Sequence, residues 1–433
     1  MTPGSREGRE LGARKAASVE KLRRELVARP VQSSGDFAAM KSTVRPLVTL
    51  ALVLALPCVS ACGESDSTPS VTAGGGGAAG TSGEDGGAPV QNQAGAPGSS
   101  GPLQAEDELR AAIASNESEV PFTLLLGDEE GTFFEGSKGD SSATTVYESA
   151  STSKWVAAAV ILNLVDEGYL SLDANVGEFV DWWTTDASDP RSAITLRQLL
   201  SFTSGLQPTA VALDEACVSN PFGTLESCVQ AIYDAAASSS LSPGAEFVYG
   251  SHHLQAAGLM AIEARGVAQW GDVFEEFKSQ TGLFPSGAFD LPSPANPRLA
   301  GGMHWTAEEY LGFLRAIFTG ELLSADSRDE LFTDQTPIGS VEIVGSPISS
   351  ANEMWHYGLG NWRECPYRTW NDSCDALGRV SSPGAYGAYP FIDFSSGFYG
   401  ILARQGALGT FRDGLQVYRD LDPLVQELAS AAK

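Results

Sequence analysis

The chain is poor in basic residues and in histidine. Of its 433 residues, 27 are Lys or Arg, 54 are Asp or Glu and 4 are His, which gives a formal net charge of −27. An acidic surface of this kind repels a phosphate backbone, so we expect no nucleic-acid partner. The few basic side chains are concentrated in residues 1–61, which hold 10 of them against 5 acidic ones. This charge asymmetry is typical of an export signal.

The apolar run over residues 47–56 is too short to span a bilayer, which takes about 20 apolar residues. It follows two basic residues, Lys41 and Arg45, and leads into Val59-Ser60-Ala61-Cys62, which resembles a bacterial lipobox. We therefore predict a lipoprotein signal peptide over residues 40–61, lipidation of Cys62 and anchoring at the bacterial cell envelope. An ordinary cleaved signal peptide and an uncleaved anchor are the alternatives.

Large apolar residues are scarce in residues 62–104, which are rich in Gly, Ser, Ala and Pro. Such a segment cannot offset its ordering entropy, so we predict a flexible linker. No repeat and no second linker follow it, and we predict one folded domain over residues 105–433. With Met40 as the natural start, residues 1–39 are expected to be a non-native extension.

Cysteine is also scarce, and the CxxC spacing of many zinc sites is absent. Two of the 6 cysteines, Cys58 and Cys62, lie in the signal region. The others form two close pairs in sequence, Cys217 with Cys228 and Cys365 with Cys374. In an oxidising compartment this pattern favours two local disulfides over a zinc site. We therefore predict an exported protein, and the sequence indicates no need for a metal or a cofactor.

Strand patterns lie near both ends of the folded part, and helix patterns lie between them. Strands are expected at residues 121–127, 132–135, 390–393 and 398–404. Helices are expected at residues 103–114, 152–167, 194–200, 254–264, 269–278, 306–318 and 415–432. Thr306 and Glu309 form a capping box at the start of one helix. We predict an α+β fold in which both chain ends build one antiparallel sheet, flanked by helices and carrying a mainly helical insertion.

The GxSxG signature of many serine hydrolases is missing. The histidines are His252, His253, His304 and His356, and their spacing indicates no Ser-His-Asp arrangement. A lysine can activate a serine instead. Ser151-Thr152-Ser153-Lys154 is an SxxK sequence at an expected helix start, where hydroxyl and amine share one helix face. SxxK also occurs at Ser18–Lys21 and Ser430–Lys433, but neither copy opens a buried helix.

Five segments in the same order resemble the superfamily of penicillin-binding proteins and class C β-lactamases, over roughly residues 105–430. They are Ser151–Lys154, Val165–Asp173, Ile194–Leu206, Pro243–Ser251, and Ala300–Met303 with Thr306–Glu308. The segment Ile194–Leu206 resembles ITLRHLLTHTSGL and is the most specific of them. The resemblance implies a β-lactamase/transpeptidase-like fold and a serine hydrolase that works through an acyl-enzyme. It implies Ser151 as nucleophile, Lys154 as its activating partner and Tyr249 as a proton carrier.

Two of the three family motifs are altered. Ser251 stands at the position of an Asn. Its side chain is shorter, which argues against the hydrogen bonds that this Asn makes to a substrate amide in the family. The third motif, Lys-Thr-Gly or His-x-Gly, is best matched by Ser382-Pro383-Gly384, with a simple Pro-Gly turn as the alternative. Gly384 would let the strand approach the substrate closely. The Ala385 N–H, with that of Ser151, would form the oxyanion hole.

Ser382 replaces a cation that helps the family hold a substrate carboxylate, so we favour neutral small-molecule or peptide esters and amides. Esterase or amidase activity comes first, then a D-amino-acid peptidase or a β-lactamase. The alternative is a catalytically reduced binding or sensor lipoprotein, which the changes at Ser251 and Ser382 favour. His252 and His253 are expected to be ordinary surface or helix-start residues.

Overall fold

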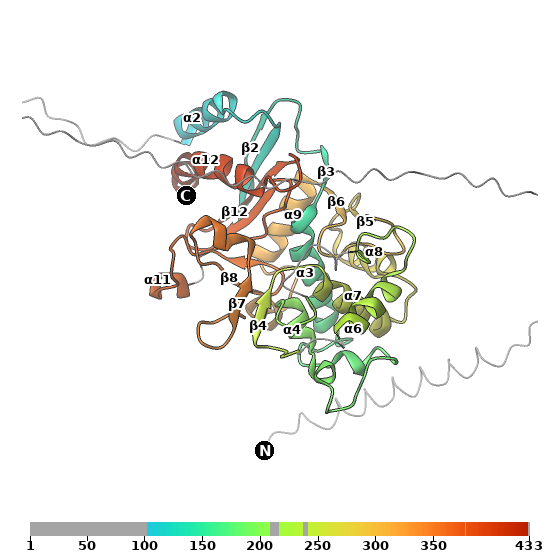
Figure 1. Ribbon diagram of the computed structural model, residues 1–433. Helices are drawn as coiled ribbons and strands as arrows, with labels where there is room; N and C mark the ends of the chain where they lie inside the picture. Colours follow the sequence, from blue (N-terminus) through green and yellow to red (C-terminus); the bar gives the residue numbers. More distant parts are fainter. Residues whose placement is uncertain (1–101, 208–215, 237–240, 377, 432–433) are drawn as a thin grey trace, which may run out of the picture. The chain divides into compact units, whose positions relative to one another are not determined.

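The computed structural model describes residues 102–207, 216–236, 241–376 and 378–431. The expected extension, the signal peptide with Cys62 and nearly all of the expected linker lie outside these residues. The first described helix, α2 (Pro102–Ser115), includes the last three residues assigned to the linker. Figure 1 shows the folded domain, in which α2 and the other helices are arranged around a twisted sheet.

A seven-stranded antiparallel sheet has the strand order β2-β1-β12-β11-β10-β9-β8. Its strands are β1 (Phe122–Asp128), β2 (Gly131–Lys138), β8 (His356–Tyr357), β9 (Trp362–Arg363), β10 (Arg379–Ser381), β11 (Tyr389–Asp393) and β12 (Phe398–Arg404). β1 pairs with β12, so that Phe122 lies opposite Arg404 and Gly127 opposite Tyr399. Both ends of the domain therefore build one sheet, and the predicted architecture is confirmed.

Helices cover both faces of this sheet, as Figure 1 shows. All seven residues of β12 are buried, which requires cover on both faces. α12 (Phe411–Ala431) contacts α2 and β11, and its Tyr418 packs on Tyr389 and Phe391. α9 (Ala307–Phe318) contacts β1 and β12, and its Phe318 packs on Tyr399. Aromatic side chains thus pack one helix against each face of the sheet.

The part of the chain between β3 and β8 is mainly helical, as expected. Its helices are α3 (Ser153–Asp166), α4 (Leu196–Leu200), α6 (Leu225–Ala236), α7 (His252–Arg265), α8 (Trp270–Thr281), α9 and α10 (Ala325–Phe332), and α11 (Asp372–Asp375) follows later. α3 is buried along 11 of its 14 residues and contacts α7, α8 and α10. A helix that is apolar all round belongs in a core. α3 is therefore the central helix of the domain.

Two small sheets were not expected from the sequence. β3 (Val146–Glu148), β6 (Met303–Thr306) and β5 (Ala288–Phe289) form one, and β4 (Glu246–Val248) pairs in parallel with β7 (Glu342–Gly345) in the other. Strands of two to four residues are too short to display an alternating pattern. The helix α6 was also missed, although its buried Leu225, Cys228, Val229 and Ile232 follow a helical period.

Local features at the ends of elements agree with the sequence. Thr306 caps α9, and its N–H donates to Glu309 Oε2 at 3.0 Å, as the capping box requires. Both expected disulfides form, Cys217–Cys228 with an S–S distance of 2.06 Å and Cys365–Cys374 with 2.08 Å. Disulfides suggest an extracellular or periplasmic location. Within the described ranges, no helix has the length and apolar character needed to cross a membrane.

Candidate active site

Ser151 and Lys154 lie one turn apart where the chain enters α3. The short 3-10 turn η2 (Ala150–Thr152) precedes the helix, and Ala150 adopts a φ of 44°. Few residues other than glycine adopt this left-handed region, and such strain is concentrated at functional sites. Lys154 Nζ donates a hydrogen bond to Ser151 Oγ at 3.0 Å. The SxxK spacing therefore brings the expected nucleophile and its partner into direct contact.

A second contact fixes the direction of the Lys154 side chain. Lys154 is 4% exposed, and its Nζ also donates to the Ala300 carbonyl at 2.7 Å. Ala300 begins the Ala300–Met303 segment, for which no chemical role was expected. A Cβ atom at Gly302 would lie 2.0 Å from the Leu291 carbonyl oxygen, so this segment passes too close to its neighbour for a side chain. The segment thus holds the amine against Ser151.

Tyr249 reaches the same hydroxyl from the small parallel sheet. It follows β4 directly, and its N–H donates to the Gly345 carbonyl at 2.8 Å. Its ring stacks on Trp362 at 5.2 Å, and Lys154 Nζ lies 4.6 Å from the ring centre. Burial raises the pKa of the Tyr249 phenol, while hydrogen bonds with the Ser151 and Trp362 side chains lower it by less. The phenol therefore keeps its proton at neutral pH and can act as a proton donor.

His253 supports the turn that carries Tyr249. Its Nδ1 accepts from Ser204 Oγ at 2.8 Å and its Nε2 donates to the Val248 carbonyl at 2.9 Å. Burial lowers the pKa of His253 to about 3, so the ring stays neutral. His252 and His253 stand at the start of α7 as expected, but they are 2% and 0% exposed. The expectation that they lie on the surface is wrong, because the Ile194–Leu206 segment covers them.

The segment Ser382-Pro383-Gly384 follows β10 and lies against the nucleophile turn. Ser382 Oγ donates to the Ser151 carbonyl at 3.0 Å. A Cβ atom at Gly384 would lie 2.7 Å from the Ser149 carbonyl oxygen, so only glycine permits this contact. Gly384 therefore packs closely against the backbone that precedes Ser151.

One small cavity joins the expected site residues. It has a volume of about 90 Å³ and is lined by Ser151, Tyr249, Pro347, Ile348, Trp362, Pro383, Ala385 and Phe411. In the described part of the chain, no hydrogen bond takes up the Ala385 N–H, and this residue shares the cavity with Ser151. Ser251 is buried at the start of α7 and does not line this cavity.

Several of the cavity residues could not be recognised in the sequence. Trp362 lies in β9, Ile348 in the 3-10 turn η5 (Pro347–Ala351) and Phe411 at the first position of α12. These elements are far apart in the chain and belong to no motif. An apolar wall can be built from any apolar side chain, so its members do not stand out in a single sequence.

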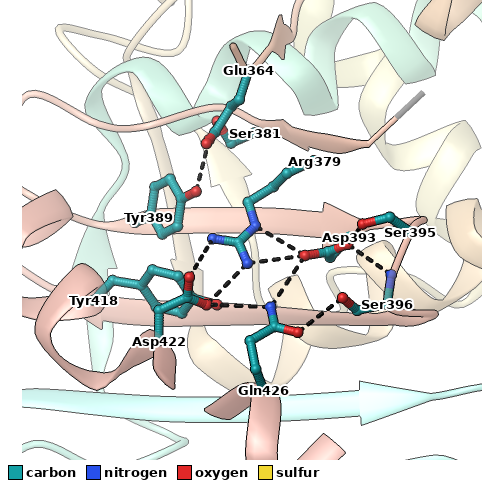
Figure 2. A network of polar contacts seen from close by, with 10 residues as sticks. All are labelled: Glu364, Arg379, Ser381, Tyr389, Asp393, Ser395, Ser396, Tyr418, Asp422 and Gln426. Atoms are coloured by element: carbon teal, nitrogen blue, oxygen red, sulfur yellow. Dashed lines mark hydrogen bonds and ion pairs between the residues drawn. The ribbon is translucent and has the colours of Figure 1, made fainter. Parts of the chain in front are cut away.

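Figure 2 shows a polar network that includes Ser381, the residue before Ser382. The Glu364 carboxyl accepts from Ser381 Oγ and from Tyr389 Oη, the latter at 2.7 Å. Burial raises the pKa of Glu364. Ser381 and Ser382 are neighbours, and side chains alternate along a strand. Ser381 is thereby held by the network, while Ser382 contacts the backbone of Ser151.

The fold and the Ser-Lys-Tyr cluster define a β-lactamase/transpeptidase-like protein, with a large antiparallel sheet flanked by helices. A model of the Beta-lactamase family matches residues 129–394. The chain belongs to this family, which consists of serine hydrolases.

Protein flp of Staphylococcus aureus (strain N315) is 32% identical over 123 residues, which are 28% of this chain and 24% of that protein. The chain thus matches about a quarter of the length of its curated relatives. A presumed beta-lactamase from Bacteroides dorei DSM 17855 has a TM-score of 0.60 at 26% identity, covering 76% of this chain and 98% of that one. EstCE1, a hydrolase with promiscuous acyltransferase activity, has a TM-score of 0.56 at 17% identity. The match covers 76% of this chain and 98% of EstCE1. The likeness to EstCE1 shows the fold alone.

Proposed function

We propose that this protein is an exported serine hydrolase that cleaves small neutral esters or amides through an acyl-enzyme. The observation that carries the proposal is the distance of 3.0 Å between Lys154 Nζ and Ser151 Oγ, with the Tyr249 phenol at the same hydroxyl. A nucleophile in contact with groups that can accept and donate protons is what acyl transfer requires. A binding or sensor protein would have no use for this cluster.

In the proposed reaction, Ser151 Oγ attacks the substrate carbonyl carbon and passes its proton to Lys154. The N–H groups of Ser151 and Ala385 stabilise the oxyanion that develops. The bond to the leaving group then breaks, and Tyr249 gives its proton to that group and regains one from Lys154. Water attacks the acyl-enzyme with the proton movements reversed, which releases the acid and restores Ser151.

The substrate class follows from the charges around the cavity. None of the residues that line it is charged, and the Ser382 hydroxyl is engaged with the Ser151 carbonyl. A substrate carboxylate would be buried there without a partner, which is costly. Neutral esters and amides therefore come first, and a D-amino-acid peptidase or a β-lactamase comes next.

The cell-envelope location remains part of the proposal. The lipobox-like sequence that ends at Cys62 and the two disulfides support export followed by lipid anchoring. A substrate would then meet the enzyme outside the cytoplasm, in the oxidising compartment that the disulfides need.

The test of this function is hydrolysis of p-nitrophenyl acetate by the purified protein and by its Ser151→Ala variant. We expect kcat to fall by at least about 10³-fold in the variant, because the attacking oxygen is lost. Ser115→Ala, at the exposed end of α2, is the matched control and should keep full activity. Equal rates for Ser151→Ala and the unmodified protein, or no turnover by either, would contradict the proposal.

A further inference from the structure

The cavity beside Ser151 is small enough to select substrates by size. Its volume is about 90 Å³. For comparison, a cavity of about 150 Å³ in a protein core holds one benzene molecule. The cavity therefore has room for a short alkyl group but not for a phenyl ring.

The far wall of this cavity is apolar and comes from separate elements. Ile348 and Trp362 are each 2% exposed, and the half-buried Phe411 ring closes the wall at the start of α12. An alkyl chain against these side chains gains about 0.8 kcal/mol for each methylene group that leaves water. A charged chain would lose its hydration and find no partner. The wall thus favours short alkyl groups.

The wall is tied to the proton donor through the small parallel sheet. Ile348 lies three residues after β7, and β7 pairs with β4, which ends just before Tyr249. The Ile348 N–H donates to Ser346 Oγ at 3.3 Å, which fixes the start of η5. The side chain that limits the cavity and the phenol that moves protons are therefore held in one local framework.

The acyl part of the substrate is the group that must fit here. It is bonded to Ser151 Oγ in the acyl-enzyme and stays in the cavity while water enters, whereas the leaving group departs. We infer that the site accepts uncharged acyl groups of about two to four carbons and that Ile348 and Phe411 set this limit. The inference rests on the proposed serine hydrolase function, and it adds the class of substrate.

The experiment measures kcat/KM for p-nitrophenyl acetate, butyrate, hexanoate and octanoate, which share one leaving group. For the unmodified protein we expect a fall of roughly tenfold or more between butyrate and hexanoate, because an extra methylene that does not fit costs at least that much. In Phe411→Ala and in Ile348→Ala, the ratio of hexanoate to butyrate should rise by roughly tenfold.

Two variants provide matched controls. Ile338 is 68% exposed and Phe222 is 95% exposed, so Ile338→Ala and Phe222→Ala remove the same side chains away from the cavity. Both should keep the chain-length profile of the unmodified protein. Because Phe411 is only half-buried, its variant still tests the limit if Ile348→Ala fails to fold.

The possible results separate this inference from the proposed function. Ser151-dependent hydrolysis of octanoate as fast as that of butyrate would overturn the size limit and leave the serine hydrolase in place. So would an unchanged profile in Phe411→Ala, with the fold intact. Absence of Ser151-dependent turnover for every ester would overturn the proposed function, and the size limit with it.

Discussion

The chemistry of Tyr249 depends on the side chains that surround it. Its ring is held between Trp362 and the Lys154 amine, and burial keeps its hydroxyl protonated. A buried phenol of this kind is better suited to donate a proton to a leaving group than to remove one from Ser151. The two proton-transfer tasks are thus divided between Lys154 and Tyr249 in the proposed reaction.

We predict that Tyr249→Phe keeps the stacked ring and loses proton donation. For alkyl esters, kcat should fall by about 10²–10⁴-fold, with a much smaller loss for p-nitrophenyl esters, because p-nitrophenolate leaves without a proton. KM should change little. Steady-state kinetics on acetate esters that share the acyl group and differ in the alcohol would measure this. An equal loss for all leaving groups would show that Tyr249 is not the acid.

The spacing of residues indicated the side chains of the proposed reaction but not the groups that hold them. Ser151, Lys154 and Tyr249 could be proposed because the chemistry requires particular side chains at particular intervals. Ala300 contributes only a carbonyl oxygen to Lys154, which any residue could supply, so its identity carries no signal. The role of Gly384 was expected as contact with the substrate, whereas the structure brings it against the Ser149 carbonyl.

At the scale of elements, Arg379 joins β10, in which it lies, to α12. Its Nη2 lies 2.9 Å from Asp393 at the end of β11 and 2.9 Å from Asp422 in α12 (Figure 2). Its guanidinium also lies over the Phe391 and Tyr418 rings. β10, β11 and α12 are therefore held by one cation, next to the segment that contacts Ser151.

We predict that Arg379→Leu destabilises the domain by about 3 kcal/mol or more, because two carboxylates lose their buried partner. The comparison is Arg315→Leu, which breaks the ion pair with Glu321, whose side chains are 40% and 58% exposed. That change should cost less than about 1 kcal/mol. Urea denaturation followed by circular dichroism measures both variants. Equal losses would mean that the Arg379 cluster is no more important than a surface pair.

Elements with a long repeating pattern were predictable, and those without one were not. The central helix α3 and the capping box of α9 follow from apolar spacing and from Thr306 with Glu309. β8 and β9 contain two residues each, so no pattern could show them. β9 pairs with β10, and β8 pairs with β9. These pairings come from tertiary contacts, which also bring Trp362 to the cavity.

For the whole molecule, the order of strand and helix patterns was enough to predict the architecture. Strands at both ends of the domain with helices between them can share one sheet only if the ends meet, and β1 does pair with β12. The parallel pairing of β4 with β7 joins residues about a hundred positions apart and had no local signal. That pairing positions Tyr249, so the sequence could name this residue but could not place it beside Ser151.

The stability of the whole fold should depend on the neutral state of His253. Its folded pKa of about 3 lies below the ordinary value of 6.5, which the unfolded chain regains. Above pH 6.5 neither state binds the proton, and the contribution of His253 to stability is complete. As the pH falls from 6.5 towards 3, only the unfolded state binds it, and stability is lost at about 1.4 kcal/mol per pH unit.

We predict that His253→Gln reduces this loss, because glutamine can still accept from Ser204 and donate to the Val248 carbonyl but does not titrate. Urea denaturation at pH 7.5, 6.5, 5.5 and 4.5 gives the free energy of unfolding of both proteins, and groups other than His253 cancel in the difference. Between pH 6 and 4.5, the slope for the unmodified protein should be steeper by about one proton. His304→Gln, at a partly exposed histidine, serves as the control. Parallel curves for the unmodified protein and His253→Gln would mean that the folded protein protonates His253 as readily as the unfolded chain does.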